Sequence, residues 1–317
     1  MSDSQTAIDE HLTSDGVLKN YDILPKQYNV NLGSSSKKYV YFDTGTMSTA
    51  DNDSLSFIDG GSPSKPFIIS IWIRISSQYQ TLGELVYFVK KGNWAGGDTT
   101  REYACGLTAD NKPFFYLADE STNGIRKSNA SSSTFTFDKW NHYIFSNTGA
   151  GDTANLTIAF NGENIGTSVS DSGTYTAMEN LGGGLVIGSS NLRADIAEVA
   201  ILPVNIDSVA HARTLLYNSG CPTDLPGPFS SLTGWWRMGD HPGDAIDNDG
   251  GDATTNRIID NGSSSLYATP SADNDWAISN FFPQTDEACA AFIPFSLGVR
   301  GVPFIRERFD AYKTNLD

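Results

Sequence analysis

Short hydrophobic runs alternate with polar turn residues along most of the chain. The clearest run is FIISIWIRI at Phe67–Ile75, in which every odd-numbered residue is apolar. Successive side chains of a strand point to opposite faces, so this run predicts a β-strand with one wholly hydrophobic face. Such a face packs against a second sheet rather than against water.

Further runs of the same kind predict about a dozen short strands. They lie at Tyr39–Phe42, Ser54–Ile58, Leu85–Lys90, Glu102–Leu107, Pro113–Leu117, Trp140–Asn147, Leu156–Phe160, Glu163–Gly166, Leu185–Gly188, Asp195–Leu202, Leu232–Met238 and Leu266–Thr269. Asp110-Asn111 and Asn161-Gly162 are hairpin turn signals, because these residues tolerate positive φ. Helical periodicity is confined to Val209–Asn218, which Asp207 or Ser208 can cap and Gly220 and Pro222 stop.

This pattern is typical of an all-β protein, an antiparallel two-sheet jelly-roll sandwich with one short helix. We expect the domain at residues 39–282, with an acidic loop at 240–260. Residues 1–38 are polar, and residues 283–317 carry prolines among large apolar side chains. Both ends are therefore expected to be extended arms.

The net charge of the chain limits the classes of molecule that it is expected to bind. The net charge is −16 with a pI near 4.5, which disfavours nucleic acid and anionic membranes as partners. The N-terminus lacks the basic and apolar regions of a signal peptide, and no apolar run reaches the length of a membrane span. We therefore expect a protein made in the cytoplasm. Cys105, Cys221 and Cys289 are expected to be buried free thiols.

Several segments, in order, resemble the laminin-G-like, concanavalin-A-like jelly-roll domains. They are DNDSLSF, KPFIISIWIRI, Lys91-Gly92, KWNHYIFSN, LTIAFNGENIG, LVIGSS and DIAEVAIL with LLYNSG. The resemblance covers about residues 51–220. The continuation GWWRMGD is similar to a subset of these domains in virion structural proteins of tailed phages, marine ones especially.

The resemblance raises the possibility of a glycoside hydrolase. Laminarinase-like glucanases of this superfamily carry an E-x-D-x-x-E strand whose first Glu is the nucleophile, and the matching positions here are Arg193, Asp195 and Glu198. A guanidinium is permanently cationic and cannot attack an anomeric carbon. The alternative is that Asp195 and Glu198 are structural, one of them paired with Arg193. We expect no enzyme activity.

Calcium is the one metal for which the sequence offers candidate ligands, and we expect no cofactor to be required. Carboxylates on loops are its usual ligands. Asp51 and Asp53 precede a strand where related domains often hold calcium, and a second acidic group lies in the loop after the GWWRM segment. That group is Asp240, Asp244, Asp247, Asp249 and Asp252. The alternative for both segments is a solvated acidic loop.

Trp94, beside Asn93 in the glycine-rich loop KGNWAGGD, is the candidate carbohydrate-binding residue. An exposed indole can stack on a pyranose ring, whereas a loop tryptophan can equally be a lid packed on the sandwich. Carbohydrate binding by a lectin-like module of a tail or fibre, used in host adsorption, is the second functional hypothesis.

The first hypothesis is a non-enzymatic virion structural protein that decorates or cements a capsid. Its C-terminal arm would bind the major capsid protein or neighbouring copies in a homo-oligomeric assembly. The arm residues proposed for this contact are Phe292, Phe295, Arg300, Phe304, Arg306 and Phe309. The alternative is that the arm folds back on its own sandwich.

Overall fold

The computed structural model describes residues 38–58, 65–77, 83–94, 100–132, 136–149, 151, 155–206, 212–222, 225–226, 229, 231–246, 256–271 and 277–280. All of them belong to one compact unit, Ser34–Cys289. No helix among them is long and apolar enough to span a membrane. The arm residues named above lie outside the described residues, so their proposed contacts stay predictions.

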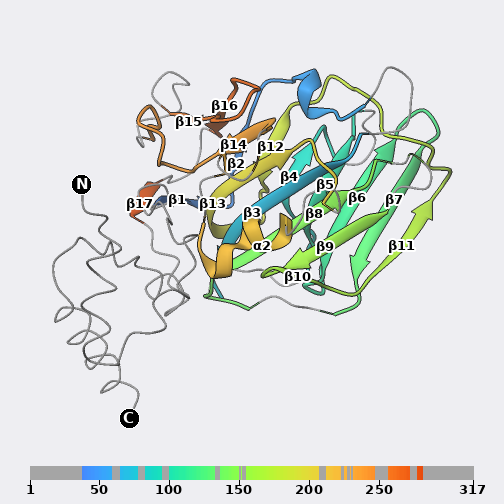
Figure 1. The fold of residues 1–317 in the computed structure, drawn as a ribbon, viewed down its shortest axis with the longest axis horizontal. Helices are drawn as coiled ribbons and strands as arrows, with labels where there is room; N and C mark the ends of the chain where they lie inside the picture. Colours follow the sequence, from blue (N-terminus) through green and yellow to red (C-terminus); the bar gives the residue numbers. More distant parts are fainter. Residues whose placement is uncertain are drawn as a thin grey trace, which may run out of the picture. The chain divides into compact units, whose positions relative to one another are not determined.

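The described residues form two antiparallel sheets (Figure 1). Sheet 1 has the order β10-β9-β8-β3-β13-β1-β17, with β14 paired to β13, and sheet 2 has the order β11-β7-β6-β5-β4-β12-β2-β16-β15. The strands of sheet 1 are β1 (Lys38–Asp43), β3 (Phe67–Ile75), β8 (Asn141–Asn147), β9 (Leu156–Phe160), β10 (Glu163–Asn164), β13 (Arg193–Leu202), β14 (Gly234–Trp236) and β17 (Ala277–Asn280). Those of sheet 2 are β2 (Thr46–Ser48), β4 (Val86–Lys91), β5 (Tyr103–Leu107), β6 (Pro113–Asp119), β7 (Gly124–Ala130), β11 (Thr167–Ser172), β12 (Leu185–Gly188), β15 (Ile258–Ile259) and β16 (Tyr267–Pro270).

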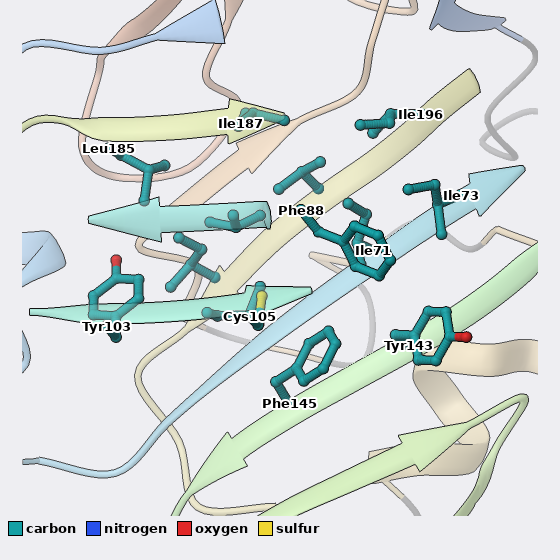
Figure 2. Close-up of a cluster of buried hydrophobic side chains, with 14 of the residues drawn as sticks. Ile71, Ile73, Phe88, Tyr103, Cys105, Tyr143, Phe145, Leu185, Ile187 and Ile196 are labelled. Atoms are coloured by element: carbon teal, nitrogen blue, oxygen red, sulfur yellow. The ribbon is translucent and has the colours of Figure 1, made fainter. Parts of the chain in front are cut away.

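The main core lies between the two sheets. Its side chains come from both, including Ile71 and Ile73 of β3 and Phe88 of β4, and all three are fully buried. Figure 2 shows them together with Tyr103, Cys105, Tyr143, Phe145, Leu185, Ile187 and Ile196. The all-apolar face of Phe67–Ile75 thus packs on a second sheet, and the predicted jelly-roll sandwich is confirmed.

A second, smaller core covers the outer face of sheet 1. The helix α2 (Ala212–Tyr217) lies beside the strands of sheet 1 (Figure 1). Its Ala212 and Leu216 belong to one buried cluster with Ile144 of β8 and Ala159 of β9. Leu215 of the same helix is 36% exposed. The helix is short and the segment Asn218–Gly220 continues as a 3-10 turn.

The structure differs from the sequence predictions at several points, and the short strands β2, β15 and β17 were not predicted. Ser54–Ile58 is not a strand, because the Asn52 side chain accepts a hydrogen bond from Ser54 N and caps a 3-10 turn at Asp53–Leu55. The strands β7 and β11 were not predicted, because their sequences, GIRKSNA and TSVSDS, lack apolar alternation. Cys105 is a buried free thiol as expected, but Cys221 is disulfide-bonded.

The adjacent runs LVIG and RADIAEVAIL enter opposite sheets. β12 pairs with β4 and β2 in sheet 2, whereas β13 pairs with β3 and β1 in sheet 1. The short connection from Ser189 to Leu192 therefore crosses from one layer to the other. A β-bulge interrupts the β13–β3 register between Ala197 and Ala200, and Glu198 within it has φ of 49°.

Candidate carbohydrate-binding surface

Two rows of side chains cross the outer face of sheet 2. In the first row, Lys90 of β4 pairs with Ala104 of β5, Ala104 with Tyr116 of β6, and Tyr116 with Lys127 of β7. The second row runs from Tyr87 through Gly106 and Phe114 to Asn129. Residues that alternate with these, such as Phe88, Cys105 and Phe115, belong to the main core, so both rows face away from it.

Aromatic rings gather on this face because the two outward residues of β5, Ala104 and Gly106, are small. The ring of Phe114 lies 4.4 Å from that of Tyr116 and 5.8 Å from that of Tyr87, centroid to centroid. Phe114 is fully buried beneath its neighbours, whereas both tyrosines are partly exposed. Burial raises the pKa of both tyrosine hydroxyls, so they remain neutral hydrogen-bonding groups near neutral pH.

Trp94 joins this cluster from the loop that follows β4. Its ring centroid is 6.4 Å from that of Tyr87 and 6.4 Å from that of Tyr116. The indole is thus equally distant from two tyrosine rings that belong to β4 and β6, the strands on either side of β5. Its Nε1 donates to the Lys91 carbonyl at 3.1 Å, and the residue stays partly exposed. We call Tyr87, Trp94, Phe114 and Tyr116 the aromatic platform.

The turn that delivers Trp94 requires a glycine. Gly92 has φ of 81°, and a Cβ at this position would lie 1.7 Å from the Thr100 carbonyl oxygen. The neighbouring candidate, Asn93, is exposed, and its backbone N–H donates to Thr100 Oγ1 at 3.2 Å. The two sequence candidates thus differ in place: Trp94 packs into the platform and Asn93 extends from its edge.

Polar and cationic groups surround the platform. Tyr116 donates its hydroxyl to Asn129 Oδ1 at 2.9 Å. The Arg101 guanidinium lies 5.9 Å from the Trp94 ring centroid and makes a bidentate pair with Glu120. Tyr87, Tyr116 and Asn129 were not singled out in the sequence, although the tyrosines occupy the outward positions of predicted strands. That alternation is the signal that could have identified them.

The residues that match the glucanase strand are held in separate ion pairs on the outer face of sheet 1. Asp195 Oδ2 lies 2.7 Å from both Nε and Nη2 of Arg74. Arg193 lies 2.8 Å from Asp43 on the neighbouring strand β1. The expected pairing of Asp195 or Glu198 with Arg193 is therefore replaced by pairs with other arginines.

Glu198 is buried behind the bulge of β13. Its carboxylate accepts a hydrogen bond from Trp235 Nε1 and lies 3.3 Å from Arg237 Nε. The Arg237 guanidinium stacks on the Trp235 ring at 4.7 Å. A carboxylate this enclosed and charge-paired orders the β13–β14 junction.

Asp51, the first calcium candidate, pairs with an ammonium group. Lys91 Nζ lies 2.6 Å from Asp51 Oδ1, 3.0 Å from Glu102 Oε1 and 2.8 Å from the Gly183 carbonyl oxygen. The side chains of Lys91 and Glu102 are both fully buried. Burial outweighs the nearby Lys91 charge and raises the pKa of Glu102 to about 7. These oxygens surround an ammonium group and do not fit a calcium ion. Asp53 is exposed at the start of its 3-10 turn.

The described part of the second acidic segment is held by backbone hydrogen bonds. Asp244 accepts the N–H groups of Gly239, His241 and Ile259, and burial raises its pKa. Asp240 lies 3.8 Å from Arg237, and the candidates Asp247, Asp249 and Asp252 lie outside the described residues. Within the described ranges, no three His, Cys, Asp or Glu side chains come together as a metal site.

Comparison with protein families identifies the superfamily of the sandwich domain. A family model of the laminin G type, described as the concanavalin A-like lectin/glucanases superfamily, matches residues 43–208. The chain belongs to this superfamily. The matched region of the lectin/glucanase domain includes β4 to β7 and Trp94, and therefore the whole aromatic platform. No curated protein matches the sequence.

Solved structures similar to this lectin/glucanase domain share little sequence with it. The receptor-binding domain of botulinum neurotoxin mosaic serotype C/D is 12% identical, over 50% of this chain and 38% of that one, with a TM-score of 0.35. The Ruminococcus gnavus IT-sialidase CBM40 is 12% identical, over 54% of this chain and 94% of that one, with a TM-score of 0.37. A Trypanosoma rangeli sialidase is 12% identical, over 48% and 22%, with a TM-score of 0.33. Values this low transfer neither ligand nor activity.

Proposed function

We propose that this domain is a non-enzymatic carbohydrate-binding module and that the aromatic platform is its binding surface. The observation that carries the proposal is the position of Trp94, whose ring lies 6.4 Å from that of Tyr87 and 6.4 Å from that of Tyr116 and which is partly exposed. A sugar ring has a face of C–H groups that packs on aromatic rings and a rim of hydroxyls that needs hydrogen-bond partners. Trp and Tyr supply the first, and polar neighbours supply the second.

The neighbours of the platform suit such a rim. Asn129 Oδ1 accepts a hydrogen bond from the Tyr116 hydroxyl, and this bond fixes the orientation of the Asn129 amide at the edge of the platform. Arg101 is held by Glu120 beside Trp94, so its guanidinium needs little further ordering when a ligand binds. A preorganised aromatic surface with a few fixed polar groups is typical of a small-ligand site.

Binding is favoured over hydrolysis within a superfamily whose description includes both lectins and glucanases. A retaining glycosidase needs two carboxyl groups about 5–5.5 Å apart, one of them a free nucleophile. Here Arg193 occupies the nucleophile position, Asp195 is paired with Arg74, and Glu198 is buried against Trp235.

The test is a glycan array probed with the full chain and with Trp94→Ala. Each 1.4 kcal/mol is a tenfold change in affinity, and we expect loss of the indole to weaken binding at least about tenfold. Tyr267→Ala is the matched control, because Tyr267 is an aromatic residue of sheet 2, 49% exposed, on β16. Trp94→Phe keeps the packing and should retain part of the affinity. Equal binding by Trp94→Ala and the parent chain would refute the proposal.

The virion structural role predicted from the sequence, with capsid proteins or neighbouring copies as partners, remains a second proposal. It depends on the arm residues, from Phe292 to Phe309, that lie outside the described residues. The two roles are compatible, because a glycan-binding sandwich on a phage particle would serve host adsorption. Particle incorporation after deletion of residues 283–317 tests the anchoring role by itself, and unchanged incorporation would refute it.

A further inference from the structure

Two lysines bracket the aromatic platform along one row of sheet 2. The row runs Lys90, Ala104, Tyr116 and Lys127 across four adjacent strands. Three strand spacings separate the two lysine backbones, about 14 Å. The Lys90 ammonium lies 5.0 Å from the Tyr87 ring centroid, and the Lys127 ammonium lies 5.9 Å from the Tyr116 ring centroid. Both cations therefore lie over the rings that would contact a sugar.

Among the described residues, no carboxylate pairs with either of these two lysines. Within the described residues, the ion pairs of this region join Arg101 to Glu120, Lys112 to Asp110 and Arg126 to Asp171, and none includes Lys90 or Lys127. The chain has 37 acidic residues against 21 basic ones. On so acidic a protein, two cations that no described carboxylate pairs, both beside one aromatic cluster, favour the approach of an anion.

The contrast with Arg101 shows what the two lysines lack. All three cations lie over a ring of the platform, but Arg101 has a bidentate carboxylate partner in Glu120. Its charge is therefore balanced within the fold. In the described part of the chain, neither Lys90 nor Lys127 has a carboxylate partner of this kind. An anionic ligand would supply that negative charge.

We infer that the glycan bound by the platform is anionic, a chain bearing carboxylate or sulfate groups that lies across β4 to β7 with its acidic groups near Lys90 and Lys127. This inference rests on the proposed function, because it assigns the ligand class of the same surface. Sugar rings would pack on Trp94 and the tyrosines, and the two ammonium groups would select the charged members of a glycan class.

The experiment compares matched polymers that differ only in charge. Hyaluronan is paired with its carboxyl-reduced form, and κ-carrageenan with its desulfated form, and affinities for the full chain are measured at low and at physiological salt. The two pairs separate carboxylate from sulfate as the recognised group. The variants are Lys90→Gln, Lys127→Gln and Trp94→Ala. Lys139→Gln is the matched control, because Lys139 is exposed in the loop before β8 of sheet 1.

The expected result is that an anionic polymer binds at least about tenfold more tightly than its neutral counterpart. Lys90→Gln and Lys127→Gln should each weaken that binding by about tenfold, the usual effect of losing one charge-assisted contact. Lys139→Gln should leave it unchanged, and salt should weaken the parent chain more than either lysine variant.

Other outcomes separate this inference from the function on which it rests. If neutral and anionic polymers bind equally and Trp94→Ala weakens both, the inference is overturned and the proposed function stands. If neither these polymers nor any arrayed glycan binds, both are overturned. If poly-glutamate binds as tightly as the anionic glycans and Trp94→Ala has no effect, charge alone is responsible and both are again overturned.

Discussion

Lys91 Nζ lies 2.6 Å from Asp51 Oδ1, at the loop where the sequence indicates a calcium site. The ammonium group also contacts the carboxylate of Glu102 and the Gly183 carbonyl oxygen. A cation that belongs to the chain thus balances Asp51. The side chains of Lys91 and Glu102 are fully buried, whereas that of Asp51 is 32% exposed. The loss of a partner should therefore destabilise the domain more when it leaves Lys91 or Glu102 unpaired than when it leaves Asp51 unpaired.

Replacing Lys91 with Met should destabilise the domain by about 3–5 kcal/mol at pH 8, because Glu102 would remain as a buried carboxylate without a counter-charge. Chemical denaturation measures the change in the free energy of unfolding. The double variant Lys91→Met/Glu102→Gln should recover much of the loss. Lys112→Met, which removes the exposed partner of Asp110, is the control and should leave the unfolding midpoint unchanged. A Lys91→Met protein as stable as the parent would show that the buried pair does not form.

Asp51 should make no contribution to any calcium response. We expect the difference in melting temperature between calcium and EGTA to be the same for the parent chain and for Asp51→Asn. The reason is that the Asp51 carboxylate and the Gly183 carbonyl oxygen already bind the Lys91 ammonium group. Thermal denaturation in both conditions measures it. A calcium stabilisation that Asp51→Asn abolishes would mean that the ion displaces Lys91.

Two buried groups predict opposite pH dependences of stability. Burial raises the pKa of Glu102 to about 7, so between about 4.5 and 7 the native state keeps a proton that the unfolded chain has released. Stability from Glu102 therefore falls as the pH rises through this window. Burial lowers the pKa of His142 to about 3, so between about 6.5 and 3 the unfolded chain binds a proton that the native state does not. Stability from His142 therefore falls as the pH falls.

Each contribution has a slope of about 1.4 kcal/mol per pH unit, and the two oppose each other between about 4.5 and 6.5. Relative to the parent chain, Glu102→Gln should gain stability as the pH rises from about 4.5 to 7. His142→Gln should gain stability as the pH falls from about 6.5. Denaturation at several pH values measures both differences. Parallel pH profiles for the parent and either variant would show that the corresponding group is not buried as described.

Glu198 should act in stability and not in catalysis. Glu198→Gln should cost about 1–3 kcal/mol, because Arg237 loses the nearer of its two carboxylate partners, Glu198 and Asp240. Hydrolysis of β-glucans should be absent in the parent and in the variant alike. Glu163→Gln, on the exposed strand β10, is the control for removal of a carboxylate. Detectable β-glucan hydrolysis that disappears in Glu198→Gln would contradict the non-enzymatic assignment.

Much of the fold could be predicted because its core strands alternate strongly. Phe67–Ile75 was predicted with its observed bounds, and the Asn161-Gly162 turn has the positive φ values expected, 48° and 85°. The strands β7 and β11 could not be predicted, since a polar edge pair such as Arg126 with Asp171 is stabilised by the neighbouring strand and not by its own apolar pattern.

The candidate site was predictable in part. Trp94 was identified from its loop, but its partners Tyr87 and Tyr116 lie on strands that pair with β5 from either side, and a single sequence does not contain that register. The Asp51 prediction failed to anticipate Lys91 for the same reason, since 40 residues separate the two groups in the chain. Spacing along the chain indicates which residues are suited to a chemistry, and strand pairing decides which of them meet.

The most direct test of the central claim is the indole N–H spectrum of the domain during a glycan titration. The Trp94 resonance is assigned by its absence in Trp94→Phe, and a binding glycan comes from the array. We predict that the Trp94 signal shifts in a saturable manner, while the signals of the buried Trp72 and Trp236 do not move. A glycan that binds with an unchanged Trp94 signal, or that shifts the buried indoles instead, would contradict the assignment of the aromatic platform as the binding surface.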